Sequence, residues 1–234
     1  MDSLARTGRA PATFAATFPQ MTGLRVSAVL LASFAVSAAP VPAVASDVPP
    51  VRQALRNNCE TAALSMLLAA HGVRVDQLTL QRRLAKSGPA DPLIRPEGML
   101  VWGDPDKGFV GRVAGGGSHG GYGVYTAPIK ALAAGYGVRL RSLNRHPASA
   151  IYARLRAGRA VMVWVGLSAG PYLRWRTAAG KTIVGNFGEH TVVLTALNGD
   201  TLTLNDPLSG RRLSWRRRAF EAMWARLGYR ALSL

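Results

Sequence analysis

Hydrophobic positions early in the chain follow a helical period. Between Cys59 and Gly72 they recur with the spacing of a helix that buries one face. These positions are Ala62, Ala63, Met66, Leu67 and Ala70. Asn57 or Asn58 can cap the start of this helix, and Gly72 supplies the left-handed residue that ends it. We therefore predict a central helix whose first turn contains Cys59.

Four further segments carry helical signals. They are residues 76–87, 126–135, 147–157 and 215–227. Asp76 and Ser214 can cap the first and the last of these helices. In the third, the spacing directs Ile151, Tyr152 and Leu155 toward the interior.

The period changes to that of strands in the second half of the chain. Residues 160–166 form a continuous apolar run, as expected for a central strand covered on both faces. Residues 189–197 and 201–206 are strand-like, and the intervening Asn198-Gly199-Asp200 predicts a tight hairpin. Residues 229–234 are expected to form a closing strand. Helices in the first half and an antiparallel sheet from the second half indicate an α+β fold.

Residues 89–125 are rich in proline and glycine, which excludes long regular elements. A loop of this length in a compact domain is usually functional or mobile, so we hypothesise that it forms one wall of a substrate groove. Asp104 and Asp106 could be taken for calcium ligands, but a calcium-binding loop needs further oxygens and a closing glutamate that are missing.

Composition adds a strong positive charge to this picture. The 234 residues suffice for one sizeable core, and their net charge is +17 at pH 7. This balance favours an anionic partner, such as a cell-wall polymer, a membrane surface or an acidic peptide. The basic residues are scattered, and no nucleic-acid-binding motif is present, so we expect no nucleic-acid partner. A solvated basic face is the alternative explanation.

Residues 1–45 read as a secretory signal peptide, and residues 46–234 as the folded domain. Arg25 precedes an apolar run, and Ala43-Val44-Ala45 offers a small-residue cleavage site. Met21 is a possible true start, and a retained N-terminal anchor is the alternative. We expect a secreted or periplasmic protein without a transmembrane span in the mature chain, because the apolar run is too short to cross a bilayer.

Cys59 is the only cysteine in the chain and the first candidate for chemistry. At the start of a helix, free N–H groups and the helix dipole stabilise a thiolate, so we expect a lowered pKa and a nucleophile. Gln53 lies six residues upstream, where its amide could donate to an oxyanion beside the sulfur. Export favours a reactive thiol, because a secreted structural cysteine usually has a partner. The alternative is a small core hydrophobe.

The predicted hairpin indicates which residue could act as the base for this nucleophile. With a turn at residues 198–199, His190 on one strand lies within about a residue of Asp206 on the other. A carboxylate beside the imidazole fixes its tautomer and favours the imidazolium. Asn205 is the other candidate, but adjacent strand residues point to opposite faces, so only one of the two can serve.

Three motifs in this order resemble a known family. Gln53 and Cys59 open an apolar helix, His190-Thr-Val-Val-Leu follows much later, and then Asn205-Asp206-Pro207. This pattern resembles the papain-like bacteriocin-processing peptidases and, since Glu60 rather than glycine follows the cysteine, their secreted stand-alone relatives. The resemblance covers most of residues 51–234. It implies a papain-like fold with Cys59 as nucleophile, Gln53 in the oxyanion hole, His190 as base and Asp206 as its orienting residue.

These observations predict a secreted cysteine peptidase that hydrolyses peptide bonds and acts as a monomer. Its expected partner is a peptide or protein substrate, cell-wall-associated or anionic. Two alternatives stay open: an amidase or transpeptidase of cell-wall peptides, and a catalytically silent peptide-binding module. No close His or Cys spacing typical of a zinc site is present, so we expect no metal and no cofactor.

Overall fold

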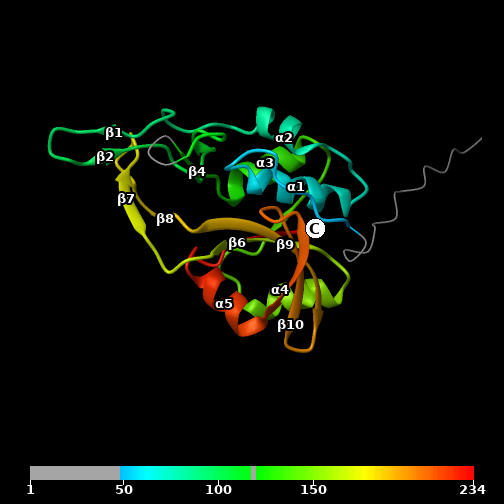
Figure 1. Ribbon diagram of the computed structural model, residues 1–234. Coiled ribbons are helices and arrows are strands. Elements are labelled where there is room, and N and C mark those ends of the chain that lie inside the picture. Colours follow the sequence, from blue (N-terminus) through cyan, green and yellow to red (C-terminus); the bar gives the residue numbers. More distant parts are fainter. Residues whose placement is uncertain (1–47, 117–119) are drawn as a thin grey trace, which may run out of the picture. The chain divides into compact units, whose positions relative to one another are not determined.

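A six-stranded sheet organises residues 48–116 and 120–234, the part of the chain that the computed structural model describes (Figure 1). The strand order is β11-β10-β9-β6-β12-β5, and every pairing is antiparallel. The strands are β5 (Arg141–Ser142), β6 (Val161–Gly166), β9 (Glu189–Asn198), β10 (Thr201–Asp206), β11 (Arg211–Arg216) and β12 (Ala231–Ser233). All six residues of β6 are buried, which confirms the predicted central strand.

Helices cover both faces of this sheet. They are α1 (Cys59–Ala69), α2 (Gln77–Arg83), α3 (Thr126–Ala134), α4 (Ala148–Arg156) and α5 (Arg217–Ala225). On one face, α1 packs against β6 and β9, α2 packs on α1, and α3 joins the same core, which contains Met162 and Trp164 of β6. On the other face, α4 and α5 pack against the alternate residues Val161, Val163 and Val165 (Figure 1). Because strand side chains alternate between faces, an all-apolar strand can fill two cores at once. The mixed α+β architecture confirms the predicted fold class.

The proline- and glycine-rich segment forms short strands that join a second sheet. The order of this sheet is β1-β2-β7-β8, with β1 (Leu93–Ile94), β2 (Leu100–Val101), β7 (Tyr172–Arg176) and β8 (Thr182–Asn186). A separate pair is formed by β3 (Val110–Gly111) and β4 (Gly121–Gly123). As predicted, no strand within residues 89–116 and 120–125 exceeds three residues.

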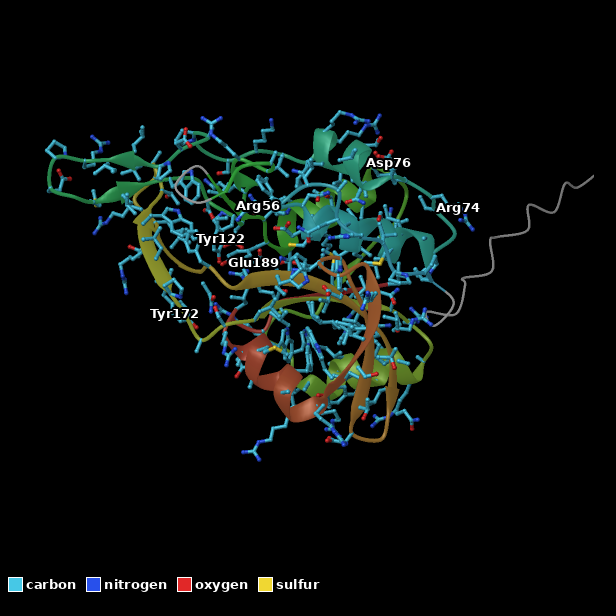
Figure 2. All side chains as sticks on the ribbon, viewed as in Figure 1. Arg56, Arg74, Asp76, Tyr122, Tyr172 and Glu189 are labelled. Carbon is cyan, nitrogen blue, oxygen red and sulfur yellow. The ribbon has the colours of Figure 1, made fainter. Side chains whose placement is uncertain are left out.

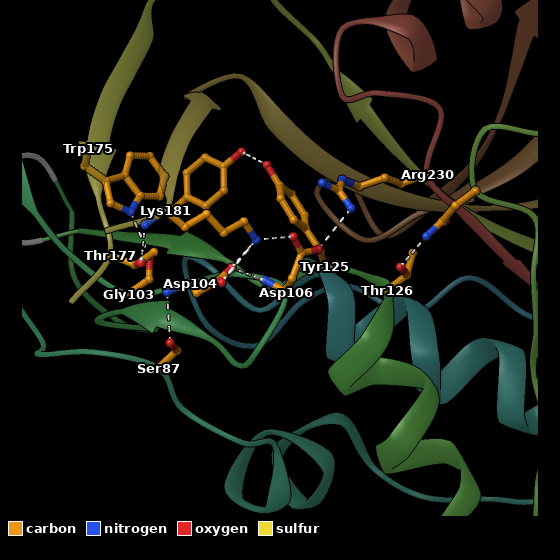
Figure 3. A network of polar contacts seen from close by, with 12 residues as sticks. Ser87, Gly103, Asp104, Asp106, Tyr125, Thr126, Trp175, Thr177, Lys181 and Arg230 are labelled. Carbon is orange, nitrogen blue, oxygen red and sulfur yellow. Dashed lines mark hydrogen bonds and ion pairs between the residues drawn. The ribbon is translucent and has the colours of Figure 1, made fainter. Parts of the chain in front are cut away.

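A polar network fixes the β7–β8 turn to this segment (Figure 3). Lys181 donates to Asp104 at 3.0 and 3.1 Å and to Asp106 at 2.9 Å. Arg230 reaches Asp106 at 3.1 Å and lies 3.6 Å from the centre of the Tyr125 ring. The two aspartates are therefore held by basic side chains, which explains their spacing without a calcium ion.

Two of the predicted helix ends need correction. Helix α2 stops at Arg83 rather than near Lys86, because Leu84 adopts an extended conformation and Lys86 bridges to Phe109. Helix α5 begins at Arg217, not at Trp215: Ser214 and Trp215 belong to β11, paired with Thr203 and Leu202. A local capping signal at Ser214 was thus overridden by pairing with β10.

The N-cap of α1 also differs from the prediction. Asn58 occupies the cap position, but its side chain accepts no bond from a free N–H of the helix and instead donates to the Thr61 hydroxyl at 3.3 Å. Its Oδ1 accepts from the Leu55 N–H at 2.8 Å, and its Nδ2 donates to Gln77 Oε1 at 2.8 Å. Asn58 therefore fixes the loop before Cys59 to α2. In contrast, Asp76 caps α2 as predicted, accepting from Leu78 and Thr79.

No helix in the described part of the chain is long and apolar enough to cross a membrane. The expected signal peptide, residues 1–45, and His119 lie outside the described residues.

Candidate active site

A cavity of about 210 Å³ brings together three of the four predicted site residues. Gln53 lies in the loop before α1, Cys59 is the first residue of α1, and His190 lies at the start of β9. Arg56, Tyr122 and Glu189 also line it (Figure 2). The fourth residue, Asp206, does not line the cavity but contacts the imidazole of His190.

His190 and Asp206 form a close pair. His190 Nε2 lies 2.6 Å from Asp206 Oδ1, and both side chains are buried. The carboxylate also accepts from the Leu208 N–H at 3.0 Å and from the N–H and hydroxyl of Ser209 at 3.0 and 2.6 Å. Burial alone would raise the pKa of Asp206, but the bonds from His190 and Ser209 outweigh it and lower this pKa below its usual range. Asp206 is therefore an anion held against the imidazole.

A register shift in the hairpin places Asp206 beside His190. The strands begin with Thr201 opposite Asn198, but the pairing shifts between Thr203 and Leu204, so that Asn205 lies opposite Val193. Residues opposite each other share a face of the sheet. Without the shift Asp206 would share a face with Val193; with it, Asp206 faces the same side as His190.

Asn205 serves a different purpose. Its Nδ2 donates to the Val48 carbonyl at 2.8 Å, and its Oδ1 accepts from Arg212 at 3.3 Å. The alternation along β10 thus directs Asp206 to the histidine and Asn205 to the chain before α1. Of the two candidates that the sequence offered, Asp206 is the one that contacts His190.

Gln53 lies in the cavity wall with its amide engaged locally. Its Nε2 donates to the carbonyls of Leu55 at 3.0 Å and Arg56 at 2.7 Å. Its Oε1 is buried and has no hydrogen-bond partner among the described residues. The backbone N–H of Gln53 donates to the Pro207 carbonyl at 2.8 Å, which ties this loop to the end of β10. The role of Gln53 as an oxyanion donor stays a prediction.

The environment of Cys59 is the opposite of the one that we predicted. Burial is the main factor that raises the pKa of the Cys59 thiol well above its ordinary value, and nearby Glu60 and Glu189 raise it further. The thiol donates to Glu60 Oε2 at 3.5 Å. The prediction of a lowered pKa was wrong, because it considered the helix terminus without the burial of the sulfur and without the charges of Glu60 and Glu189.

Glu60 and Glu189 are the functional candidates that sequence reasoning missed. Donor atoms of Cys59, Glu60 and Glu189 lie within 4.8 Å of one another. Such a cluster could share a cation, but its spacing alone does not define a metal site. The adjacency of Glu60 to Cys59 and of Glu189 to His190 was visible in the sequence; the proximity of the two glutamates was not.

A helix that begins with the cysteine and packs on an antiparallel sheet carrying a His–Asp pair defines the class of the papain-like cysteine peptidases. The chain belongs to the Peptidase_C39 like family, whose model matches residues 45–232. Family membership indicates a hydrolase of the cysteine-peptidase type.

Two relatives support this assignment. The uncharacterized protein YvpB of Bacillus subtilis (strain 168) is 34% identical over 182 residues, which cover 76% of this chain and 69% of YvpB. A crystal structure assigned to a C39-like peptidase from Bacillus anthracis superposes with a TM-score of 0.69 at 28% identity, covering 82% of this chain and 96% of that one.

Proposed function

We propose that this protein is a secreted cysteine peptidase that hydrolyses peptide bonds with Cys59, His190, Asp206 and Gln53. The observation that carries the proposal is the single cavity lined by Cys59, Gln53 and the Asp206-bound His190. A nucleophile, a base and a group that orients the base are the set required for covalent acyl transfer.

Asp206 assigns the two nitrogens of His190 to different tasks. It binds Nε2, which leaves Nδ1 as the ring nitrogen that can exchange a proton with the thiol. Because burial keeps Cys59 in the thiol form, His190 acts as a general base that removes the proton as sulfur attacks. The side chain of Cys59 turns from Glu60 toward His190 for this step.

The reaction then follows acyl-enzyme chemistry. The sulfur bonds to the scissile carbonyl carbon, and the carbonyl oxygen takes the negative charge. The backbone N–H of Cys59 and the amide of Gln53, released from its own turn, stabilise that oxyanion. The imidazolium of His190 returns its proton to the leaving amine, and water, deprotonated by His190, hydrolyses the thioester and restores the thiol.

The rim of the cavity suggests a peptide with apolar side chains. Leu167, Phe187 and Leu208 line it and are 42%, 46% and 54% exposed, so each can still lose apolar surface to a ligand. Arg56 adds a positive charge at the same rim, and the whole chain carries +17. We propose an extracytoplasmic monomer acting on peptides or proteins that are anionic or held in an anionic cell wall, without nucleic acid, metal or cofactor.

The test is turnover of a peptide mixture by the full chain and by its His190→Ala variant, followed by mass spectrometry. Loss of the base should lower the rate by about 10²–10⁴-fold. His146→Ala is the matched control, because His146 is exposed and lines a different cavity. Full activity of His190→Ala would refute the assignment.

The same experiment separates the alternatives. Added glycinamide captured in the products would indicate a transpeptidase or amidase that resolves the acyl enzyme with an amine. Binding without any turnover by the unmodified chain would indicate a catalytically silent module.

A further inference from the structure

The carboxyl groups of Glu60 and Glu189 meet beside the nucleophile in a closed environment. Glu60 is 1% exposed, and Glu189 is partly buried. Glu60 Oε1 accepts from the Val124 N–H at 2.6 Å, and Glu189 Oε1 accepts from the Thr191 hydroxyl at 3.3 Å. The second oxygen of Glu60 accepts from the Cys59 thiol at 3.5 Å, so this carboxyl links the chain after β4 to the sulfur.

The backbone of β4 is shaped around this pair. Gly123 has a φ of +119°, which L side chains rarely adopt. A Cβ at this position would lie 2.3 Å from Glu60 Oε1 and 3.1 Å from Glu189 Oε2. The backbone of β4 can therefore approach the two carboxyls this closely only because residue 123 is glycine.

No cation compensates the pair directly. Within residues 48–116 and 120–234, neither glutamate forms a salt bridge. The charged or titratable side chains around the pair are Cys59, His190, Tyr122, Tyr125, Arg56 on the cavity rim and Arg230 beside Tyr125. Elements α2, α3 and β6 contribute uncharged side chains to the packing around α1: Leu80, Gln81, Ile129, Met162 and Trp164. Two carboxylates in such a place repel each other.

We propose that Glu60 and Glu189 form a proton-binding carboxyl pair that controls when Cys59 becomes a nucleophile. While Glu60 is protonated, the thiol can turn to His190 and give up its proton there. When Glu60 is ionised, the thiol is retained as a hydrogen-bond donor to the Glu60 carboxylate. The proposal rests on the peptidase function above and adds Glu60 as a residue that contacts the reacting sulfur.

The direction of this control follows from the electrostatics. Burial raises the pKa of Glu60 to about 7 and is also the main factor that raises the pKa of Glu189, with the charge of Glu60 second. Glu60 is therefore mainly protonated below pH 7 and mainly ionised above it, so the pair gains negative charge as the pH rises. A negative charge near sulfur disfavours the thiolate, so reactivity is suppressed on the alkaline side.

The test is the rate of Cys59 alkylation by iodoacetamide between pH 6 and 9 in the full chain and in Glu60→Gln. Glutamine keeps an oxygen for the Val124 N–H but cannot ionise. At pH 6 the two rates should agree, because Glu60 is already protonated. At pH 9 the variant should react about tenfold faster, the equivalent of one pKa unit. Coincident profiles at every pH would overturn the proposal.

Three further variants check this interpretation of the pH profile. Glu97→Gln, at an exposed site on the β1–β2 turn, removes the same charge and should leave the profile unchanged. Glu189→Gln supplies a second test if Glu60→Gln does not fold, with the same pH-dependent gain expected. His190→Ala separates the two proposals: if it retains both alkylation and peptide turnover, the triad fails, while a Glu60-dependent profile still supports the carboxyl pair.

Discussion

The carboxyl groups on the two sides of the cavity have pKa values that are shifted in opposite directions. Asp206 accepts four hydrogen bonds, from His190, Leu208 and twice from Ser209, and its pKa is lowered. Glu60 accepts from the Val124 N–H and the Cys59 thiol, and burial raises its pKa to about 7. The difference shows that donors, rather than proximity to a charged partner alone, decide whether a buried carboxyl is an anion or an acid.

We expect the Asp206 side and the Glu60 side of the cavity to have different roles. In the proposed mechanism, the Asp206 anion orients the imidazole throughout the reaction. On the nucleophile side, the charge of Glu60 changes near pH 7, because burial raises its pKa to about 7. Substitutions at Asp206, Glu60 and Lys181 test this difference, and their expected effects decrease in that order.

Asp206→Asn should have the largest effect. An amide can still accept one bond, but it removes the charge that stabilises the imidazolium and can select the wrong tautomer. We expect kcat to fall about 10²–10⁴-fold, measured as peptide turnover with folding checked by circular dichroism. Unchanged turnover would mean that the buried anion is only structural.

Glu60→Gln should change the pH dependence of stability. The folded-state pKa is raised from 4.5 to about 7, so the folded chain binds more protons in this window and its stability falls as pH rises through it. The loss is about 3 kcal/mol for such a shift. Denaturant unfolding at pH 5 and pH 8 should show that Glu60→Gln gains stability over the unmodified chain mainly at pH 8.

Glu60→Ala is the matched control for this prediction. It removes the same charge but leaves the Val124 N–H without an acceptor, which costs about 1–3 kcal/mol at every pH. An equal gain for alanine and glutamine would show that the Val124 bond does not contribute to stability.

Lys181→Met should have the smallest effect. Lys181 is half exposed but is the cation on buried Asp104, so its loss should destabilise the chain by about 1 kcal/mol. It lies away from both sides of the cavity, so turnover should stay within about twofold of the unmodified rate. A large loss of turnover would indicate that the network in Figure 3 supports the site.

Much of the fold could be predicted because its elements have strong local periods. The apolar run of β6 and the hairpin between β9 and β10 lie where the sequence indicated them. Helix α1 also lies at the predicted residues, but the prediction that it buries one face was wrong: every residue from Cys59 to Leu68 is buried. Errors fell at boundaries where tertiary pairing competed with a local signal, as at Ser214, which joined β11 instead of capping a helix.

The local sequence is enough to predict which residues form the site and which elements carry them. It placed a cysteine at the start of a helix and a histidine within reach of Asp206, because helix caps and hairpin turns are local signals. The charge state around these residues depends on tertiary packing. The register shift that directs Asp206 to His190 and the approach of Glu60 to Glu189 depend on contacts between distant segments. Because burial and donors set a pKa, and both arise from packing, the chemistry of Cys59 could not be read from its neighbours in sequence.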